Sequence, residues 1–302
     1  MSISKYFTQL SSRPVLGQSL ANVSVLRLDQ CGGSAPGNKW FKLQGNIAHA
    51  RKQGISTLVS FGGAWSNHLH ALAAVGSKLG LQTVGIIRGE RPDKPSAMLQ
   101  DARAWGMQLI YVSRDQYRRR NELQYIAEIG SRFHPCLVIP EGGANVAGVD
   151  GCKAIAELLL GAGIGCHKIV LAVGTGTTLA GVVQGLGLGF GGEVLGISVL
   201  KGAVDLDSRI ASFTNENCAH WRILHGHHCG GYARVNPALR EFILAFQDVH
   251  QIPLDPVYTG KALFAIHQLL VSRQWDRELP VVFVHTGGLQ GRRGFSWLSE
   301  PI

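Results

Sequence analysis

A lysine beside an asparagine is the first residue whose type and position could support catalysis. Lys39 stands in the segment Gly37-Asn38-Lys39-Trp40-Phe41-Lys42, just before residues 43–52, whose apolar spacing predicts a helix. A lysine amine becomes a Schiff-base nucleophile when apolar surroundings or a nearby cation lower its pKa. Lys42, three residues on, could be that cation. On these residues alone a solvated lysine pair is the more ordinary interpretation.

A second candidate follows the strand expected at residues 57–61. The chain continues as Gly62-Gly63-Ala64-Trp65-Ser66-Asn67-His68, and Ser66 is a candidate N-cap for a helix over residues 67–78. Ligands of α/β proteins bind at the carboxyl ends of parallel strands, and the N–H groups of a helix start suit a carboxylate. A plain N-cap beside flexible glycines is an equally good interpretation.

A third candidate, Val173-Gly174-Thr175-Gly176-Thr177, follows a clear strand pattern at residues 168–173 and opens a helix. Its glycines free backbone N–H groups and its threonines add hydroxyl donors, which suits a phosphate. No lysine follows the second glycine, so the loop is not of the Walker A type. Leu179 occupies the third glycine position of the dinucleotide fingerprint. Phosphate binding without nucleotide recognition is favoured over a plain turn.

Two C-terminal segments complete the candidates. Asp255-Pro256-Val257-Tyr258-Thr259-Gly260-Lys261 precedes a helix, and Val284-His285-Thr286-Gly287-Gly288 ends a strand with a small polar residue and glycines. A crowded tract, His225-Gly226-His227-His228-Cys229, could suggest a metal site. Its spacing differs from that of zinc sites and no second cluster completes it, so we expect a polar loop and no metal.

Composition restricts the classes of protein. Of 302 residues 45% are hydrophobic and 16% charged, which predicts a large folded core. The net charge is +9, yet the densest basic run, Arg118-Arg119-Arg120, lies in an ordinary helical pattern and no aromatic platform interleaves with it, so nucleic-acid binding is not expected. Six cysteines without a CxxC pair are expected to be reduced and mostly buried. With no signal peptide and no membrane-length apolar run, we expect a soluble cytoplasmic protein.

Strand-like apolar runs alternate with helical patterns along the chain. This order predicts an α/β fold with mostly parallel sheet and helices on both faces, in two halves that meet near residues 141–150. A less regular segment is expected from about residue 200 to residue 235. Strands are expected at residues 25–28, 57–61, 83–87, 108–112, 136–139, 168–173, 194–199 and 280–285. Helices are expected at residues 43–52, 67–78, 96–105, 115–130, 149–160, 178–186, 237–249 and 260–272.

Taken in this order, the segments around Lys39, Ser66-Asn67, Ile139–Gly143, the phosphate loop and Thr286 resemble the pyridoxal 5′-phosphate (PLP) enzymes of the tryptophan-synthase-β fold, fold type II. Within that group the chain is most similar to the 1-aminocyclopropane-1-carboxylate (ACC) deaminase and D-cysteine desulfhydrase family. The resemblance implies two open, twisted, mostly parallel sheets. It also implies a larger discontinuous PLP-binding domain, residues 1–42 and 150–302, and a smaller domain, residues 43–149.

The resemblance also implies residue roles. Lys39 would be the Schiff-base lysine and Ser66 a catalytic serine that faces the cofactor. Asn67 would bind the pyridoxal 3′-oxygen, and Thr286 would face the pyridine nitrogen. Tyr258 would be the active-site tyrosine. The remaining implied contacts are with the phosphate, from Val173, Gly174, Thr175, Gly176 and Thr177, and with the substrate, from Trp65, Ser66, Asn67, His68 and Tyr232.

Thr259 and Thr286 stand where ACC deaminases have Glu and Leu, as they do in desulfhydrase-like members. A threonine hydroxyl cannot hold a proton on the pyridine nitrogen as a carboxylate does. A weaker electron sink suffices for β-elimination from a small amino acid but is poorer for opening a cyclopropane ring. We therefore expect a D-cysteine desulfhydrase-like lyase that releases pyruvate, ammonia and sulfide, with either Lys39 or Ser66 as the base. Phe41 and Trp65 depart from the family pattern and leave the substrate open.

Several alternatives stay open. The same cofactor supports ACC deamination, serine or threonine dehydration and racemisation. A protein of a different class could bind PLP or phosphate without turnover, and a plain α/β domain would bind no cofactor. Members of the family are commonly homodimers, so the resemblance implies a homodimer.

Overall fold

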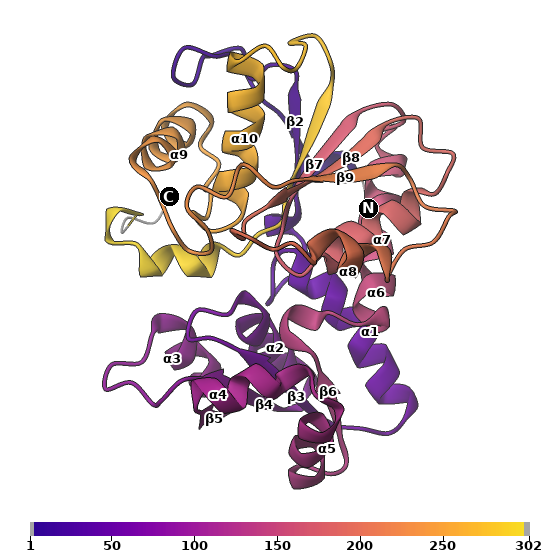
Figure 1. Cartoon of the computed structure of the whole chain (residues 1–302), viewed down its shortest axis with the longest axis vertical. Helices are drawn as coiled ribbons and strands as arrows, with labels where there is room; N and C mark the ends of the chain where they lie inside the picture. Colours follow the sequence, from indigo (N-terminus) through magenta and orange to yellow (C-terminus); the bar gives the residue numbers. More distant parts are fainter. Residues whose placement is uncertain (1–2, 299–302) are drawn as a thin grey trace. The chain divides into compact units, whose positions relative to one another are not determined.

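The structure is a computed structural model that describes residues 3–298 (Figure 1). These residues form two compact units: a larger one of residues 3–31 and 152–289, and a smaller one of residues 32–151 and 290–298. The sequence-based division differs in assigning residues 32–42, 150–151 and 290–298 to the larger domain. Residues 38–42 belong with residues 43–52 because together they form one helix, α1 (Asn38–Lys52), which begins five residues earlier than its apolar pattern predicts.

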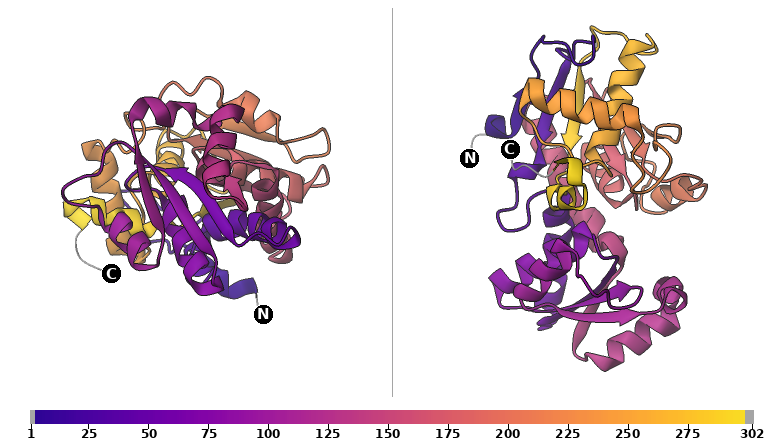
Figure 2. Two further views of the ribbon diagram at one scale, coloured as in Figure 1. Left: turned by 90° about the horizontal axis from the view of Figure 1, so that it is seen from below. Right: turned by 90° about the vertical axis from the view of Figure 1, so that its left-hand side faces the viewer.

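The smaller unit is built on a four-stranded parallel sheet in the order β5-β4-β3-β6. Alternate residues of β3 face opposite sides, with Leu58 on one face and Val59 and Phe61 on the other. The right-hand view of Figure 2 shows helices above and below this sheet. The strands are β3 (Thr57–Gly62), β4 (Gln82–Arg88), β5 (Gln108–Val112) and β6 (Cys136–Ile139).

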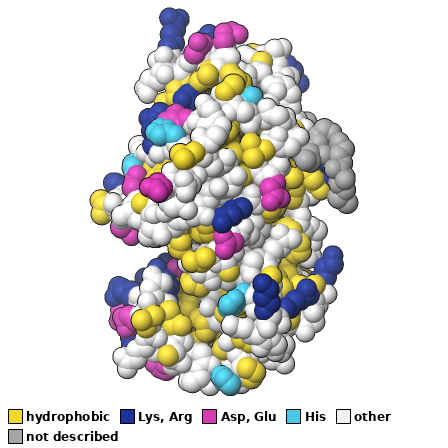
Figure 3. Space-filling model, turned by 90° about the vertical axis from the view of Figure 1, so that its right-hand side faces the viewer, with side chains coloured by type: hydrophobic (Ala, Val, Ile, Leu, Met, Phe, Trp, Pro, Cys, Tyr) yellow, Lys and Arg dark blue, Asp and Glu magenta, His cyan; other side chains and the backbone are white. Residues whose placement is uncertain are grey.

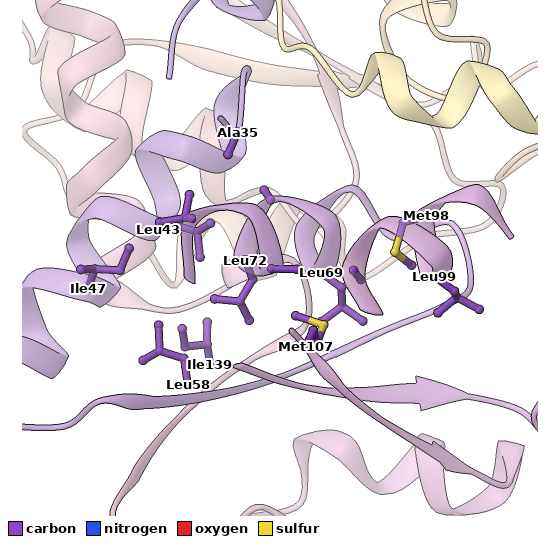
Figure 4. Close-up of a cluster of buried hydrophobic side chains, with 14 of the residues drawn as sticks. Ala35, Leu43, Ile47, Leu58, Leu69, Leu72, Met98, Leu99, Met107 and Ile139 are labelled. Carbon is purple, nitrogen blue, oxygen red and sulfur yellow. The ribbon is translucent and has the colours of Figure 1, made fainter. Parts of the chain in front are cut away.

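One face of this sheet is covered by α1, α2 (Asn67–Leu79) and α3 (Ala97–Ala104). Figure 4 shows how Leu43 and Ile47 of α1 and Leu69 and Leu72 of α2 meet Leu58 in this core. These side chains lie three or four positions apart on each helix, which is the spacing of one helical face. The core holds α2, and therefore its N-terminus, rigidly above the carboxyl end of β3.

The other face is covered by α4 (Arg114–Arg118) and α5 (Leu123–Arg132), where a single helix over residues 115–130 was predicted. A short 3₁₀ segment, η3 (Arg119–Asn121), separates the two helices. In this 3₁₀ segment two arginines form ion pairs with different carboxylates: Arg119 with Glu122 and Arg120 with Glu141. Tyr117 and Ile129 place the two helices separately on the sheet. The prediction of one continuous helix was therefore wrong.

The larger unit contains a six-stranded sheet in the order β1-β2-β10-β7-β8-β9. Among the strand pairs of residues 3–298 only β1–β2 is antiparallel, so the prediction of mostly parallel sheet is confirmed in both units. The strands are β1 (Phe7–Gln9), β2 (Val23–Arg27), β7 (Lys168–Val173), β8 (Glu193–Ser198), β9 (Trp221–Leu224) and β10 (Val281–His285).

Helices lie on both faces of this second sheet (Figure 1). The connections β7–α7–β8 and β8–α8–β9 move along the sheet in one direction, whereas α9 and α10 lead back to β10. Since such crossovers are right-handed, the two pairs of helices cover opposite faces. The helices are α7 (Thr177–Leu186), α8 (Leu206–Ala211), α9 (Pro237–His250) and α10 (Thr259–Val271), and α6 (Val146–Gly161) runs through the boundary between the units. The remaining short 3₁₀ turns are η1 (Ile3–Tyr6), η2 (Leu28–Gln30), η4 (Glu141–Gly143), η5 (Leu289–Gly294) and η6 (Ser296–Leu298).

Surface features bear on three expectations. On the face drawn in Figure 3, acidic side chains lie among the Lys and Arg side chains. All six cysteines are free thiols, but only Cys31 and Cys152 are buried and Cys166 is exposed, so the expectation that most are buried was wrong. Within residues 3–298, none of the helices combines the length and the apolar character needed to cross a membrane.

Candidate active site

Ser66 caps the helix that follows β3. Its Oγ accepts a hydrogen bond from the N–H of Leu69 at 3.2 Å, so the predicted N-cap is confirmed. The chain reaches this position through a tight approach, because a Cβ added to Gly62 would lie 2.5 Å from Ser66 Oγ. Asn67 and His68 therefore occupy the first turn of α2, where N–H groups and the helix dipole favour anions.

Lys39 lies in the first turn of α1, and not just ahead of the helix as the sequence suggested. Its Nζ donates to Asn38 Oδ1 at 3.0 Å, and the side chain is half-buried. Lys42, on the same helix, is buried and donates to the carbonyl oxygen of Gly142 at 3.1 Å. The smaller unit thus holds one lysine amine within reach of solvent and a second amine fixed to the backbone.

His68 is buried and bound to Ser60 of β3, with 2.9 Å between His68 Nε2 and Ser60 Oγ. Ser60 Oγ also lies 2.8 Å from the carbonyl oxygen of Ile139, to which its only hydrogen must be donated. His68 Nε2 is therefore the protonated nitrogen and donates to Ser60. Its Nδ1 is an acceptor, buried and without a hydrogen-bond partner in the part of the chain that the structure describes.

The charge state of His68 follows from its surroundings. Burial, and then the ammonium groups of Lys39 and Lys42, lower the pKa of His68 to about 3. A Cβ added to Gly143 would lie 3.3 Å from Lys42 Cβ and 3.4 Å from His68 Cε1, so these two side chains pack around one glycine. His68 is thus a neutral imidazole throughout the physiological range, beside two lysines.

The loop before α2 is held by the C-terminal segment of the smaller unit. Trp65 is 38% exposed, and its indole ring would lie 3.3 Å from a Cβ added to Gly294. Gln290 donates to the carbonyl oxygen of Trp65 at 3.3 Å and to Asn67 Oδ1 at 2.5 Å. Sequence reasoning missed Gln290, although it follows the Thr286-Gly287-Gly288 motif by only two residues.

In the larger unit, the expected phosphate loop leads directly from β7 into α7. Gly176 is the N-cap of α7 and has φ +88°, a left-handed conformation that an L-residue rarely adopts. A Cβ at this position would also lie 2.4 Å from Ile210 Cγ1. Since glycine has no side chain, Gly176 itself cannot cap the first N–H groups of α7. The hydroxyl oxygens of Thr175 and Thr177 lie 3.0 Å apart beside them.

Tyr258 lies against this loop. A Cβ added to Gly174 would lie 3.3 Å from the Tyr258 ring, and the rings of Tyr258 and Tyr232 make an edge-to-face pair with centroids 6.2 Å apart. The structure therefore brings three of the predicted features together in the larger unit: the loop, Tyr258 and Tyr232.

The carboxylate of Asp255 fixes the start of α10. Its oxygens accept from the N–H groups of Tyr258 at 2.8 Å and Thr259 at 2.9 Å. The Thr259 hydroxyl, fully buried, is 2.7 Å from Asp255 Oδ2 and accepts from the Asp255 N–H at 2.8 Å. Thr259 thus stabilises this turn through its side chain, so a threonine at this position has a structural role that needs no ligand.

Thr286 follows β10 at the same edge of the sheet as the phosphate loop. The register pairs Phe283 with Val170, so continuing it by three residues puts Thr286 level with Val173. Thr286 is buried, and the preceding His285 donates from Nε2 to the carbonyl oxygen of Pro253 at 2.7 Å. The carboxyl edge of two neighbouring parallel strands therefore carries a phosphate-type loop and a neutral hydroxyl.

Lys261 and the histidine tract have structural partners. Lys261 is fully buried, donates to the carbonyl oxygen of Gly231 at 2.6 Å, and has a pKa lowered by burial. His225 contacts Asp207 at 2.7 Å and His227 contacts Gln268 at 3.1 Å, which accounts for the polar loop. Among residues 3–298 there is no group of three or more His, Cys, Asp and Glu side chains that could hold a metal ion.

Comparison with known proteins supports a single family. The sequence model described as "Pyridoxal-phosphate dependent enzyme" matches residues 7–287. A protein of Pyrococcus horikoshii with the provisional name 1-aminocyclopropane-1-carboxylate deaminase is 28% identical over 282 residues, which cover 90% of this chain and 86% of that protein. A protein of Pyrococcus abyssi with the same name is 28% identical over 300 residues, 94% of this chain and 90% of that one.

Solved structures agree. A crystal structure described as an ACC deaminase homologue superposes with a TM-score of 0.78 and 26% identity, covering 98% of this chain and 97% of that chain. A hydrogen sulfide-producing enzyme from Fusobacterium nucleatum shares the fold, with a TM-score of 0.67, 14% identity and coverage of 96% and 98%.

Proposed function

The chain belongs to the family of pyridoxal-phosphate dependent enzymes, and from this premise we propose that it is a lyase that removes a β-substituent from a small amino acid, in the manner of D-cysteine desulfhydrase. The overall reaction with D-cysteine would consume one water and release pyruvate, ammonia and hydrogen sulfide. Bound PLP would supply the electron sink that accepts the electron pair left when the α-proton is removed. Family membership gives the cofactor, whereas the substrate is part of our proposal.

The phosphate of PLP fits the loop at α7. A dianion needs several convergent N–H donors, and a helix of ten residues that starts at a glycine N-cap offers them. Thr175 and Thr177, whose hydroxyls are hydrogen-bonded to each other, add a hydroxyl donor at the same place. Tyr258 packs against Gly174, so its ring would border the cofactor beside the phosphate. This arrangement supports phosphate binding by residues 173–177.

Lys39 is the residue to which we assign covalent attachment of PLP and removal of the α-proton. It is half-buried at a helix start, and its neighbour Lys42 is already bound to a backbone carbonyl. Ser66 is the other candidate base, but its Oγ is engaged as acceptor for the Leu69 N–H. None of the described residues bonded to Ser66 Oγ is a base that could deprotonate it. This hydroxyl therefore suits hydrogen bonding to the ligand better than proton abstraction.

We assign the remaining residues as follows. Asn67 would donate to the ring oxygen of PLP, and Trp65, His68 and Tyr232 would border the substrate, whose carboxylate would lie at the N-terminus of α2. His68 remains neutral there, so it leaves the net charge of the site unchanged. Buried Thr286 would face the pyridine nitrogen.

The observation that carries the choice of reaction is Thr286 at the edge shared by β10 and β7. Its neutral hydroxyl accepts or donates a hydrogen bond but cannot stabilise a protonated pyridine as a carboxylate does. A weaker electron sink favours loss of a good leaving group such as thiolate over opening of a cyclopropane ring. Thr259 stands where ACC deaminases have Glu, and its hydroxyl is bound to Asp255, so this position offers the pyridine no carboxylate either.

We also propose a homodimer on the family pattern, which sedimentation equilibrium would test.

Product analysis tests the proposal. The purified protein, loaded with PLP, is incubated separately with D-cysteine, L-serine and ACC, and pyruvate, sulfide, 2-oxobutyrate and ammonia are measured. We expect sulfide and pyruvate from D-cysteine in equal amounts and no 2-oxobutyrate from ACC. Turnover of ACC alone would overturn the argument from Thr286, and bound PLP with no product from any amino acid would indicate a binding protein.

A further inference from the structure

The carboxamide of Gln290 in η5 is held between two acceptors. Its Nε2 donates to the carbonyl oxygen of Trp65 at 3.3 Å and to Asn67 Oδ1 at 2.5 Å. A backbone carbonyl can only accept, so the atom of Gln290 that faces Trp65 must be the amino nitrogen. The main chain of Trp65 therefore determines which way the Gln290 amide points.

That orientation determines the orientation of Asn67 in turn. Since Gln290 presents N–H groups, Asn67 must face it with Oδ1, and its Nδ2 is turned the other way. Asn67 is half-buried, and within residues 3–298 its Nδ2 makes no hydrogen bond. The carbonyl of Trp65 thus orients the Gln290 amide, and Gln290 in turn orients the Asn67 amide at the start of α2.

A second observation shows that this orientation is maintained at a cost. Gln290 Oε1 is buried and accepts no hydrogen bond from the described residues. A buried unpaired acceptor is unfavourable, and a native structure retains one where other contacts determine the geometry. Turning the amide would not relieve it, because Oε1 would then face two other oxygens.

We propose that Gln290 is a positioning residue that holds Asn67 with Nδ2 as a fixed donor to an anionic oxygen of bound PLP. The inference rests on the proposed function, in which Asn67 contacts the cofactor. A hydrogen bond donated to an oxyanion favours its deprotonated form. With the donor held in place, bound PLP loses its ring-associated proton at a lower pH than it would with a freely turning asparagine.

Substitution of Gln290 by methionine tests this without adding charge. Two quantities are measured on the PLP-loaded protein: the pH midpoint of its visible absorbance change and the dissociation constant for PLP. We expect Gln290→Met to raise the midpoint and to weaken PLP binding about threefold to tenfold, the usual effect of one hydrogen bond. Asn67→Ala should shift both quantities in the same direction and further.

The double variant distinguishes positioning from a general structural effect. If Gln290 acts through Asn67, adding Gln290→Met to Asn67→Ala changes neither quantity further. Gln100→Met is the matched control, because Gln100 also donates to a backbone carbonyl of this unit, that of Pro95 at 2.8 Å, and no contact joins it to Asn67. The control should keep the wild-type midpoint and PLP affinity.

Two outcomes would overturn the inference in distinguishable ways. A wild-type midpoint in Gln290→Met, with a shifted one in Asn67→Ala, removes the role of Gln290 and leaves the cofactor contact of Asn67 in place. So does a Gln290 effect that persists in the Asn67→Ala background. An unshifted Asn67→Ala removes that contact from the proposed function and the inference with it. Circular dichroism of each variant establishes that it is folded.

Discussion

Two helices of this protein begin in nearly the same way. Each follows a buried strand of a parallel sheet through a glycine-containing loop: α2 after β3 in the smaller unit, and α7 after β7 in the larger. Their N-caps differ. Ser66 caps α2 with its own hydroxyl, whereas the N-cap of α7 is Gly176, which has no side chain.

The residues that follow the N-cap in the first turn also differ between α2 and α7. In α2 the N-cap is followed by Asn67 and the buried, neutral His68, which are side chains that can orient and select a ligand. In α7 it is followed by two buried threonines, Thr177 and Thr178. One helix start therefore offers mainly backbone donors for a dianion, and the other offers side chains for chemistry. The presence of a side chain at the N-cap separates these two uses of the same local fold.

The strongest test of this division is Lys39→Ala, which removes the amine assigned to covalent chemistry. We expect loss of PLP trapped by borohydride and a fall in kcat/KM of at least about 10³-fold, since nucleophile and base are lost together. Lys42→Ala is the control, because its amine is bound to Gly142. Label that survives in Lys39→Ala, at Lys42 for example, would contradict the assignment.

The second test concerns His68, which has no titratable counterpart at α7. Its pKa is lowered from 6.5 to about 3 in the folded protein, so between these values the unfolded chain binds a proton that the folded chain does not. Stability is therefore complete above pH 6.5 and is lost as the pH falls toward 3. From pH 7 to pH 5 this single group should cost about 2 kcal/mol.

Urea denaturation at the two pH values, compared between the wild type and His68→Gln, isolates that contribution. Carboxylates and the other buried histidines are common to both proteins, so they cancel in the difference. The variant should lose about 2 kcal/mol less than the wild type on acidification. An equal loss in both would show that His68 is not buried as a neutral imidazole.

The third test concerns the N-cap of α7. Gly176→Ala places a Cβ at φ +88° and against Ile210, so the loop must shift. A left-handed L-residue costs about 1–2 kcal/mol, and if PLP binding needs this loop its affinity should fall about tenfold. Gly80→Ala is the control, with φ +67° at the end of α2 and open space around the site of its Cβ. Equal PLP affinity in the two variants would argue against a phosphate site.

Much of the fold could be predicted because strands buried on both faces are continuous apolar runs. Residues 168–173 were predicted and observed as a strand without any difference. The edge strands β1 and β9 of the larger unit were missed, since they are only three and four residues long and mix polar with apolar side chains. The helix predicted over residues 115–130 is interrupted at residues 119–121, where Arg120 pairs with the distant Glu141, a contact that no local pattern reveals.

The candidate site divides in the same way. Glycines and small polar residues after strands marked the loops at Ser66 and Gly176, because backbone geometry there depends on local sequence. Ser60, Gln290 and Lys261 were missed as partners of site residues. Their contacts join segments up to 223 positions apart, as between Gln290 and Asn67. Such contacts exist only after the chain has folded.

The smallest effect on activity is expected for Ser66→Ala. This variant tests whether Ser66 has a catalytic role in addition to capping α2. Ser113 Oγ caps α4 in the same unit by accepting from Gln116 N–H at 3.1 Å. Ser113→Ala is therefore the matched control, because it also removes one N-cap hydrogen bond. Each variant should lose about 1 kcal/mol of stability to urea. If Lys39 takes the α-proton, kcat should fall at most about tenfold in Ser66→Ala and not at all in Ser113→Ala. A fall of about 10²-fold or more in Ser66→Ala would assign proton abstraction to the serine instead.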